Sequence, residues 1–148
     1  MRIIKNVRHI GIVVSNINKS LNFFHNILGF KIYNNQIEKG EFISKILNKK
    51  DCNVNTIKLI APDGNMIELL CFKKKHIKKN IKKNINIDSF GITHISFTVF
   101  DINKVYKILK NEKIKFLSKP VISSDKKVKV VFCKVFDNYF FELVETLK

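Results

Sequence analysis

The sequence has no apolar run approaching the roughly 18–20 residues that a membrane-spanning helix needs. Residues 1–6 lack the apolar stretch of a secretion signal. Cysteine is also scarce: Cys52, Cys71 and Cys133 lie far apart and form no CxxC pair. This spacing argues against a disulfide framework and against a thiolate zinc site. We therefore expect a cytoplasmic protein whose cysteines are small core residues.

Arginine is nearly absent from a strongly basic chain. The formal net charge is +16, but Arg2 and Arg8 are the only arginines among 28 basic residues. Such a charge favours a nucleic-acid partner, yet arginine is the usual side chain for bidentate contacts with guanine and phosphate. Seven lysines fall within residues 73–83, where isoleucines recur at helical spacing. We interpret this run as a solvated connector, with a basic helix for RNA or an acidic membrane as the alternative. We therefore expect neither a nucleic-acid nor a membrane partner.

The chain repeats itself. An offset of 85 superposes two Ile-Asn-Lys runs and brings His9 over His94. An offset of 74 brings Glu68 over Glu142. The difference of 11 residues must lie in the first half, and the apolar spacing within residues 38–47 predicts a short extra helix there.

Each half has the pattern of a βαβββ unit. The first combines strands at 7–14 and 30–37, a helix capped by Asn16 and closed by Gly29, and a hairpin of 54–61 and 66–72. The second combines strands at 92–100 and 114–117, a helix capped by Asp101, and a hairpin of 128–135 and 139–145. The fold class is therefore α+β. We expect one domain over residues 1–148, with modules at about 5–72 and 90–148 and a connector at about 73–89, because neither half has enough core alone.

Strand alternation indicates where the matched polar residues point. Apolar residues flank both glutamates, and His9 and His94 alternate with bulky residues along their strands. The bulky faces should lie under the helices, and the four matched residues should line a cavity. Weaker candidates for its substrate-binding wall, from strand alternation alone, are Val13, Met66, Ser96, Thr98 and Phe140.

Two imidazoles and two carboxylates suit one divalent metal ion such as Ni²⁺, Zn²⁺, Co²⁺, Fe²⁺ or Mn²⁺. The expected metal ligands are therefore His9, Glu68, His94 and Glu142. An octahedral site would keep two positions for water or a bidentate substrate, with a carboxylate as the base. The alternative is that the histidines are ordinary half-buried residues and the glutamates strand-edge charges. Recurrence of all four in register argues for ligands, because buried charges need partners.

The pattern resembles the vicinal oxygen chelate superfamily, which includes glyoxalase I, methylmalonyl-CoA epimerase, extradiol dioxygenases and the fosfomycin and bleomycin resistance proteins. The resemblance covers nearly the whole chain except residues 73–89. It is carried by His9–Val14, Asn16–Phe24, Leu28–Phe30, Pro62–Leu69, Gly91–Ile95 and Asp137–Leu143. It implies paired βαβββ modules that form a curved eight-stranded mixed sheet around a metal.

The His, Glu, His, Glu set is similar to that of bacterial, nickel-using glyoxalase I. This implies a lactoylglutathione lyase-like lyase or isomerase that acts on a small carbonyl compound or thioester through a metal-stabilised enediolate, with Glu142 or Glu68 moving the proton. The family's glutathione-binding features do not match: residues 31–35 contain no arginine, and residues 123–127 lack the glycine-rich segment.

Three alternatives remain open. One is a methylmalonyl-CoA epimerase-like isomerase, whose relatives have glutamine where Glu68 stands; the others are a ring-cleaving dioxygenase and a non-catalytic, resistance-type binding protein. The expected partner is a small-molecule substrate, and the positive charge favours an anionic one. A homodimer is a further expectation, because in some relatives the partner completes the site.

Overall fold

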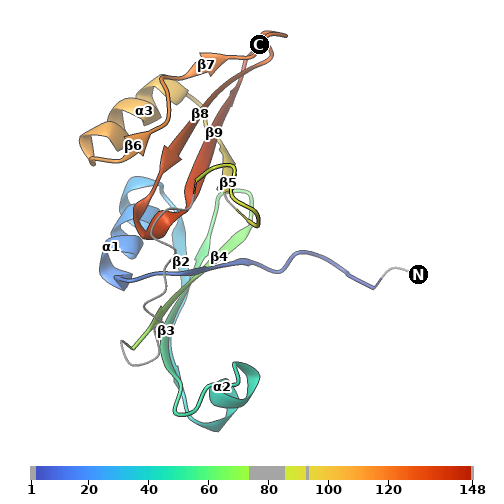
Figure 1. Cartoon of the computed structure of the whole chain (residues 1–148), viewed down its shortest axis with the longest axis vertical. Coiled ribbons are helices and arrows are strands. Elements are labelled where there is room, and N and C mark those ends of the chain that lie inside the picture. Colours follow the sequence, from blue (N-terminus) through green and yellow to red (C-terminus); the bar gives the residue numbers. More distant parts are fainter. Residues whose placement is uncertain (1–2, 74–85, 93, 148) are drawn as a thin grey trace. The chain divides into compact units, whose positions relative to one another are not determined.

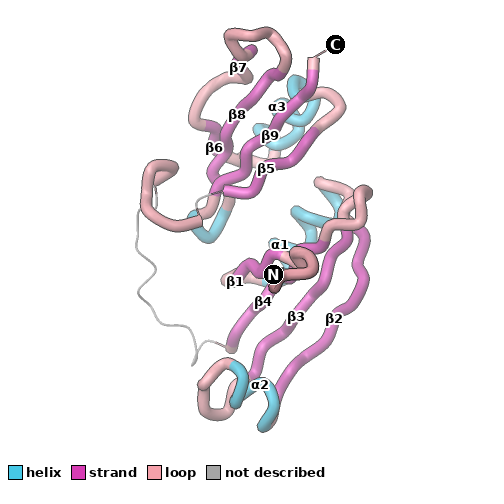
Figure 2. Tube along the Cα trace, turned by 90° about the vertical axis from the view of Figure 1, so that its right-hand side faces the viewer, coloured by secondary structure: helices cyan, strands magenta, loops and turns pink. Residues whose placement is uncertain are grey.

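The computed structural model describes residues 3–73, 86–92 and 94–147 (Figures 1 and 2). It divides into two compact units, residues 1–79 and 80–148. Most of the lysine-rich connector, at 74–85, lies outside the described residues, so its predicted character is not tested.

The first unit is built on a four-stranded mixed sheet with the order β1-β4-β3-β2 (Figure 2). Its strands are β1 (Ile10–Val13), β2 (Lys31–Lys39), β3 (Asn53–Ile60) and β4 (Met66–Phe72). β1 pairs with β4 in parallel, and the other two pairs are antiparallel. The parallel pair brings the first strand of the unit beside its last strand, which is the βαβββ arrangement that the sequence predicts.

The predicted first helix is interrupted after its first turn. α1 (Ile17–Leu21) continues as a π-helical segment, η1 (Asn22–Ile27). The Asn16 side chain accepts a hydrogen bond from the backbone N–H of Lys19 at 3.0 Å, as the predicted cap requires. The segment ends at Ile27, two residues before Gly29, whose φ of +80° lies in the left-handed region that glycine adopts without strain. Two phenylalanines of η1 are buried, and Phe24 packs edge-on against Phe30.

α2 (Glu41–Ile46) lies between β2 and β3 and confirms the extra helix expected in the first half. Figure 1 shows it at the end of the β2–β3 hairpin. The helix buries Ile43 in a small cluster with Cys52 and Val54, against which Leu70 and other apolar side chains pack. The insertion therefore covers the end of the sheet with its own apolar cluster.

The second unit repeats this plan with one addition. Its sheet has the order β5-β9-β8-β6, with β7 also paired to β8. Its elements are β5 (His94–Thr98), α3 (Ile102–Asn111), β6 (Lys115–Phe116), β7 (Val121–Ile122), β8 (Val128–Lys134), the 3₁₀ turn η3 (Phe136–Asn138) and β9 (Phe140–Thr146). β5 and β9 are parallel, as β1 and β4 are. The short strand β7 was not predicted, and it gives this sheet a fifth strand.

α3 has two side-chain caps. The Asp101 carboxylate accepts from the backbone N–H of Lys104 at 2.9 Å, which confirms the predicted cap. Glu145, from β9, accepts from the N–H of Ile102 at 2.8 Å and so ties the helix to the sheet. Leu109 and Phe141 are completely buried in this unit. Among the described residues, no helix has the length and apolar character needed to cross a membrane.

Candidate metal centre

The first unit brings its matched histidine and glutamate together. His9 immediately precedes β1, and Glu68 is the third residue of β4. Gly11 stands opposite Glu68 in the parallel register, so the histidine lies two residues before that position. The Nε2 atom of His9 is 3.2 Å from Oε2 of Glu68, and the two side chains are 28% and 13% exposed. The pair is therefore largely withdrawn from water.

The other ring nitrogen of His9, Nδ1, is buried and has no hydrogen-bond partner among the described residues. A buried polar atom without a partner is costly and needs an explanation. An imidazole beside a carboxylate is also a donor pair that borderline divalent metals accept. The residues of this unit therefore fit a metal ion in donor type.

A lysine that the sequence did not single out also contacts Glu68. Lys58 stands directly opposite Glu68 in the β3–β4 register. Its Nζ atom is 3.5 Å from Oε1 of Glu68, and its side chain is 24% exposed. The carboxylate thus lies between a histidine on one oxygen and a lysine on the other. Strand alternation places Lys58 on this face, but only the register of the hairpin puts it beside Glu68.

The second unit contains the matching pair. His94 begins β5, and Glu142 is the third residue of β9. Ser96 stands opposite Glu142, so the histidine again lies two residues before that position. Nε2 of His94 is 3.9 Å from Oε2 of Glu142, and the side chains are 40% and 24% exposed. This pair has a longer separation and is more exposed to solvent than the His9–Glu68 pair.

The neighbours of both glutamates confirm the predicted strand faces. Ile67 and Leu69 beside Glu68 are buried, as are Phe141 and Leu143 beside Glu142. Because successive side chains alternate in direction, both glutamates point away from these buried residues. Each unit therefore presents one histidine and one glutamate on the face of its sheet opposite the apolar core.

Comparison with known proteins identifies the family of this chain. The family model of the Glyoxalase/Bleomycin resistance protein/Dioxygenase superfamily matches residues 8–138. The chain belongs to this superfamily.

Three solved structures with this fold illustrate its range. A glyoxalase family protein from Bacillus cereus has a TM-score of 0.88 at 20% identity, covering 100% of this chain and 99% of that chain. The fosfomycin resistance protein FosX from Listeria monocytogenes, complexed with Mn(II) and sulfate, has a TM-score of 0.64 at 15% identity, with 98% and 95% covered. An integron cassette protein from V. cholerae has a TM-score of 0.57 at 14% identity, with 98% of both chains covered. No curated protein matches the chain.

The superfamily fold brings the four predicted ligands together as two pairs, one in each unit. Within the described part of the chain, no group of three or more histidine, cysteine, aspartate or glutamate side chains has the proximity that a metal ion needs. The remaining histidine described, His25, uses Nδ1 to donate to the carbonyl of Phe30 at 2.7 Å and lies on the helix surface.

The predicted wall residues differ in exposure. Val13 is 57% exposed on the face of β1 that also carries Gly11. Met66 is half-buried at the start of β4, and Ser96 and Thr98 are exposed on β5. Phe140 is buried within the second unit, with Nζ of Lys134 lying 5.4 Å from the centre of its ring. Their role as a substrate wall stays a prediction.

The cysteines are reduced and have no metal-ligand arrangement among the described residues. Cys52 and Cys133 are buried, which confirms that they are core residues, and Cys71 is half-buried. Burial raises the pKa of the Cys133 thiol to about 12, so it stays protonated at neutral pH. Burial also raises the pKa of Tyr139, and the nearby charge of Asp137 adds to the rise.

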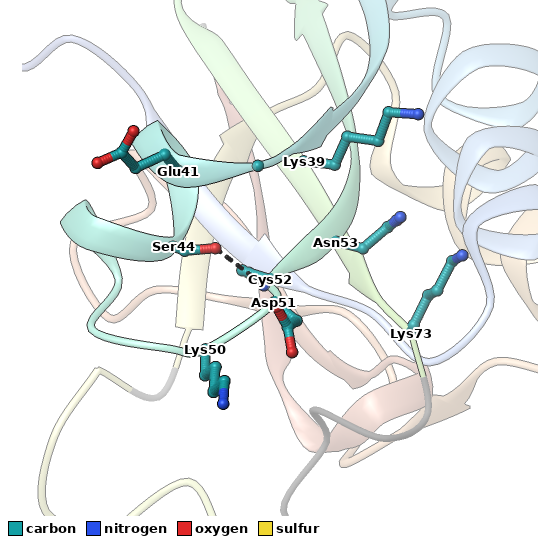
Figure 3. A pocket seen from close by; sticks show the side chains of 9 residues that line it. Lys39, Glu41, Ser44, Lys50, Asp51, Cys52, Asn53 and Lys73 are labelled. Atoms are coloured by element: carbon teal, nitrogen blue, oxygen red, sulfur yellow. Dashed lines mark hydrogen bonds between the residues drawn. The ribbon is translucent and has the colours of Figure 1, made fainter.

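The first unit also has a hollow of about 510 Å³ beside α2 (Figure 3). Most of the residues that line it have polar or charged side chains. Ser44 Oγ accepts a hydrogen bond there from the N–H of Cys52 at 3.0 Å. The lining includes Lys39, Lys50, Asp51 and Lys73 but none of the predicted site residues. Lys73 follows the end of β4, five residues beyond Glu68, a separation of roughly 16 Å along an extended strand. The hollow is therefore distinct from the His9–Glu68 pair.

Proposed function

We propose that this protein is a metal-dependent lyase or isomerase of the glyoxalase I type, acting on a small carbonyl compound or thioester. One observation carries the proposal: each unit contains a histidine–glutamate pair at the same register position, at 3.2 Å in the first unit and 3.9 Å in the second. Unrelated polar side chains would not be expected to recur at the same register position in both units.

We propose that His9 and Glu68, together with His94 and Glu142, hold one divalent metal ion among Ni²⁺, Zn²⁺, Co²⁺, Fe²⁺ and Mn²⁺. The donor types support this set, because imidazole and carboxylate are common ligands of these ions. When bound, such an ion would supply Lewis-acid chemistry, which would polarise two neighbouring substrate oxygens and offset the negative charge that develops on them. The Nδ1 atom of His9 is buried and has no hydrogen-bond partner in the part of the chain that the structure describes, which also supports a bound cofactor or solvent molecule there.

The chain's own residues would bind the substrate and move a proton. Glu142 is the better candidate for the base, because its ion pair with His94 is 3.9 Å long, whereas Glu68 is held by His9 at 3.2 Å and by Lys58 at 3.5 Å. A carboxylate with looser contacts can turn toward a substrate carbon with less loss of interaction energy. Glu68 would then act as the more rigid ligand.

Relatives support a substrate with neighbouring oxygens. A variant of FosX is complexed with Mn(II) and 1S,2S-dihydroxypropylphosphonic acid, a compound with hydroxyls on adjacent carbons and an anionic phosphonate. For this chain, we propose only that the substrate has two oxygens on adjacent atoms, placed beside the metal.

The test uses the full-length protein loaded in turn with each of the five ions. The probes are the hemithioacetals of methylglyoxal with glutathione and with 2-mercaptoethanol, the second because the sequence lacks the family's glutathione-binding features. We expect isomerisation to the thioester, seen as an absorbance increase. Glu142→Gln should lower kcat by about a hundredfold or more, and Glu112→Gln, at the exposed C-terminal end of α3, should leave it unchanged.

The same preparations distinguish the alternatives. Oxygen uptake with catechol by the Fe²⁺ form would indicate a ring-cleaving dioxygenase, and epimerisation of methylmalonyl-CoA would indicate the related isomerase. Tight binding of a small molecule without turnover would favour a resistance-type binding protein. If the metal-loaded protein isomerises neither hemithioacetal, the glyoxalase-type assignment fails.

A further inference from the structure

We propose that Lys58 binds an anionic group of the substrate, an oxyanion of the carboxylate or phosphonate class, next to Glu68. This inference rests on the proposed function, since it assigns the residue a place beside one of the proposed metal ligands. It adds a substrate-binding residue and a substrate charge that the superfamily fold alone does not specify.

The position of Lys58 supports such a role. It is in the middle of β3, directly opposite Glu68 in β4, on the face of the sheet that also carries the His9–Glu68 pair. Its side chain is only 24% exposed, although lysine is one of the residue types most often found in water. Among the described residues, the carboxylate within ion-pair distance of its ammonium group is that of Glu68. A half-buried ammonium group needs an anion within reach.

Comparison of the two units shows that the lysine occurs in the first unit and not at the matched position of the second. The offset that brings Glu68 over Glu142 brings Lys58 over Phe132, and Phe132 stands opposite Glu142 as Lys58 stands opposite Glu68. In the second unit, the ring of His94 packs edge-on against Phe132, with 5.3 Å between ring centres. The two histidine–glutamate pairs are thus matched, whereas the residue beside each glutamate is cationic in one unit and aromatic in the other.

Charge balance indicates what the lysine would contact in the loaded protein. Two neutral imidazoles and two carboxylates would neutralise one divalent ion. The ammonium group of Lys58 would then add one positive charge next to the metal. Its carboxylate partner, Glu68, would be shared with the metal ion. An anionic substrate would restore neutrality, whereas a neutral substrate would leave the ammonium group half-buried and poorly paired.

The experiment measures anion binding to Mn(II)-loaded, full-length protein by calorimetry. The probes are glycolate, which has a carboxylate beside a hydroxyl, and glycolamide, its uncharged counterpart. Lys58→Met keeps the aliphatic stem and removes the charge, Lys58→Arg keeps the charge, and Lys31→Met changes an exposed lysine of β2 in the same unit. Far-ultraviolet circular dichroism and the Mn(II) stoichiometry are recorded for each variant.

We expect Lys58→Met to bind Mn(II) stoichiometrically and to weaken glycolate binding by about tenfold or more, because a charge-assisted hydrogen bond is lost. Glycolamide binding should stay within about twofold, and Lys58→Arg and Lys31→Met should bind glycolate nearly as the wild type does. Unchanged glycolate binding by metal-loaded Lys58→Met would overturn the inference and leave the proposed function standing. Loss of Mn(II) from Lys58→Met would overturn it too, because the lysine would then serve only to position Glu68. A wild type that binds none of the five ions would overturn both.

Discussion

Leu69 and Leu143 are matched core residues, each following a predicted metal-ligand glutamate, and truncating them tests whether the two units fold together. Leu69 is 0% exposed in β4 and Leu143 is 1% exposed in β9. We propose that residues 1–148 form one cooperative domain, as expected from the small core of each half. Leu69→Ala and Leu143→Ala should then destabilise the same folded state.

The size of the effect follows from burial. Truncating a fully buried leucine to alanine costs about 3 kcal/mol or more, through lost apolar burial and the cavity left behind. With a urea dependence of about 2 kcal/mol per molar, a loss of that size moves the unfolding midpoint by about 1.5 M. A unit of this size rarely has more than about 3–5 kcal/mol of stability on its own, so either substitution would nearly unfold an independent unit.

The assay is urea unfolding, followed by circular dichroism and by near-ultraviolet absorbance of the tyrosines. Two of these, Tyr106 and Tyr139, lie in the second unit, and Tyr33 lies in the first. We expect a single transition for the wild type, and one transition shifted to lower urea by a similar amount in both variants. Two separate transitions, with each substitution moving only one of them, would refute cooperative folding.

Two further predictions concern the second unit. Burial raises the pKa of Cys133 from 9.0 to about 12 and also raises that of Tyr139, so their contribution to stability is complete below about pH 9 and is lost as the pH rises toward 12. Cys133→Ala should reduce this alkaline loss of unfolding free energy in a series of urea titrations, and an unchanged dependence of that free energy on pH would contradict the prediction. Asp101→Ala removes the acceptor for the N–H of Lys104 and should lower the free energy of unfolding by about 1 kcal/mol, whereas Asp101→Asn should lower it much less. Equal stability of both variants in urea would contradict this and show that the second cap, from Glu145, is sufficient.

Much of the fold could be predicted because the repeat supplied a second copy of each pattern. Matching His9 with His94 and Glu68 with Glu142 used two different offsets, and their difference indicated the insertion that proves to be α2. Asn16 and Asp101 cap their helices as predicted because a short polar side chain before an apolar-periodic segment satisfies the first free N–H groups. The buried neighbours of both glutamates follow from the two-residue period of a strand.

Other features depend on tertiary contacts that sequence patterns do not encode. The π-helical turn over Asn22–Ile27 buries two adjacent phenylalanines, which a regular helix would separate by about 100°. β7 has only two residues and follows Pro120, so it has no period to detect. Lys58 is one of many lysines, and its place beside Glu68 is set by the register of the β3–β4 hairpin.

The central claim is that both histidine–glutamate pairs serve one metal ion, and metal analysis of the purified protein tests it most directly. Full-length wild type, Glu68→Gln, His94→Ala and the surface control Glu112→Gln are each dialysed against each of the five divalent ions and analysed by inductively coupled plasma mass spectrometry. The account predicts one ion per chain in the wild type and the control. It predicts strong loss both in the first-unit variant and in the second-unit variant, because the ion needs ligands from both. Wild type that retains none of the ions, or variants that all retain one equally, would contradict the account.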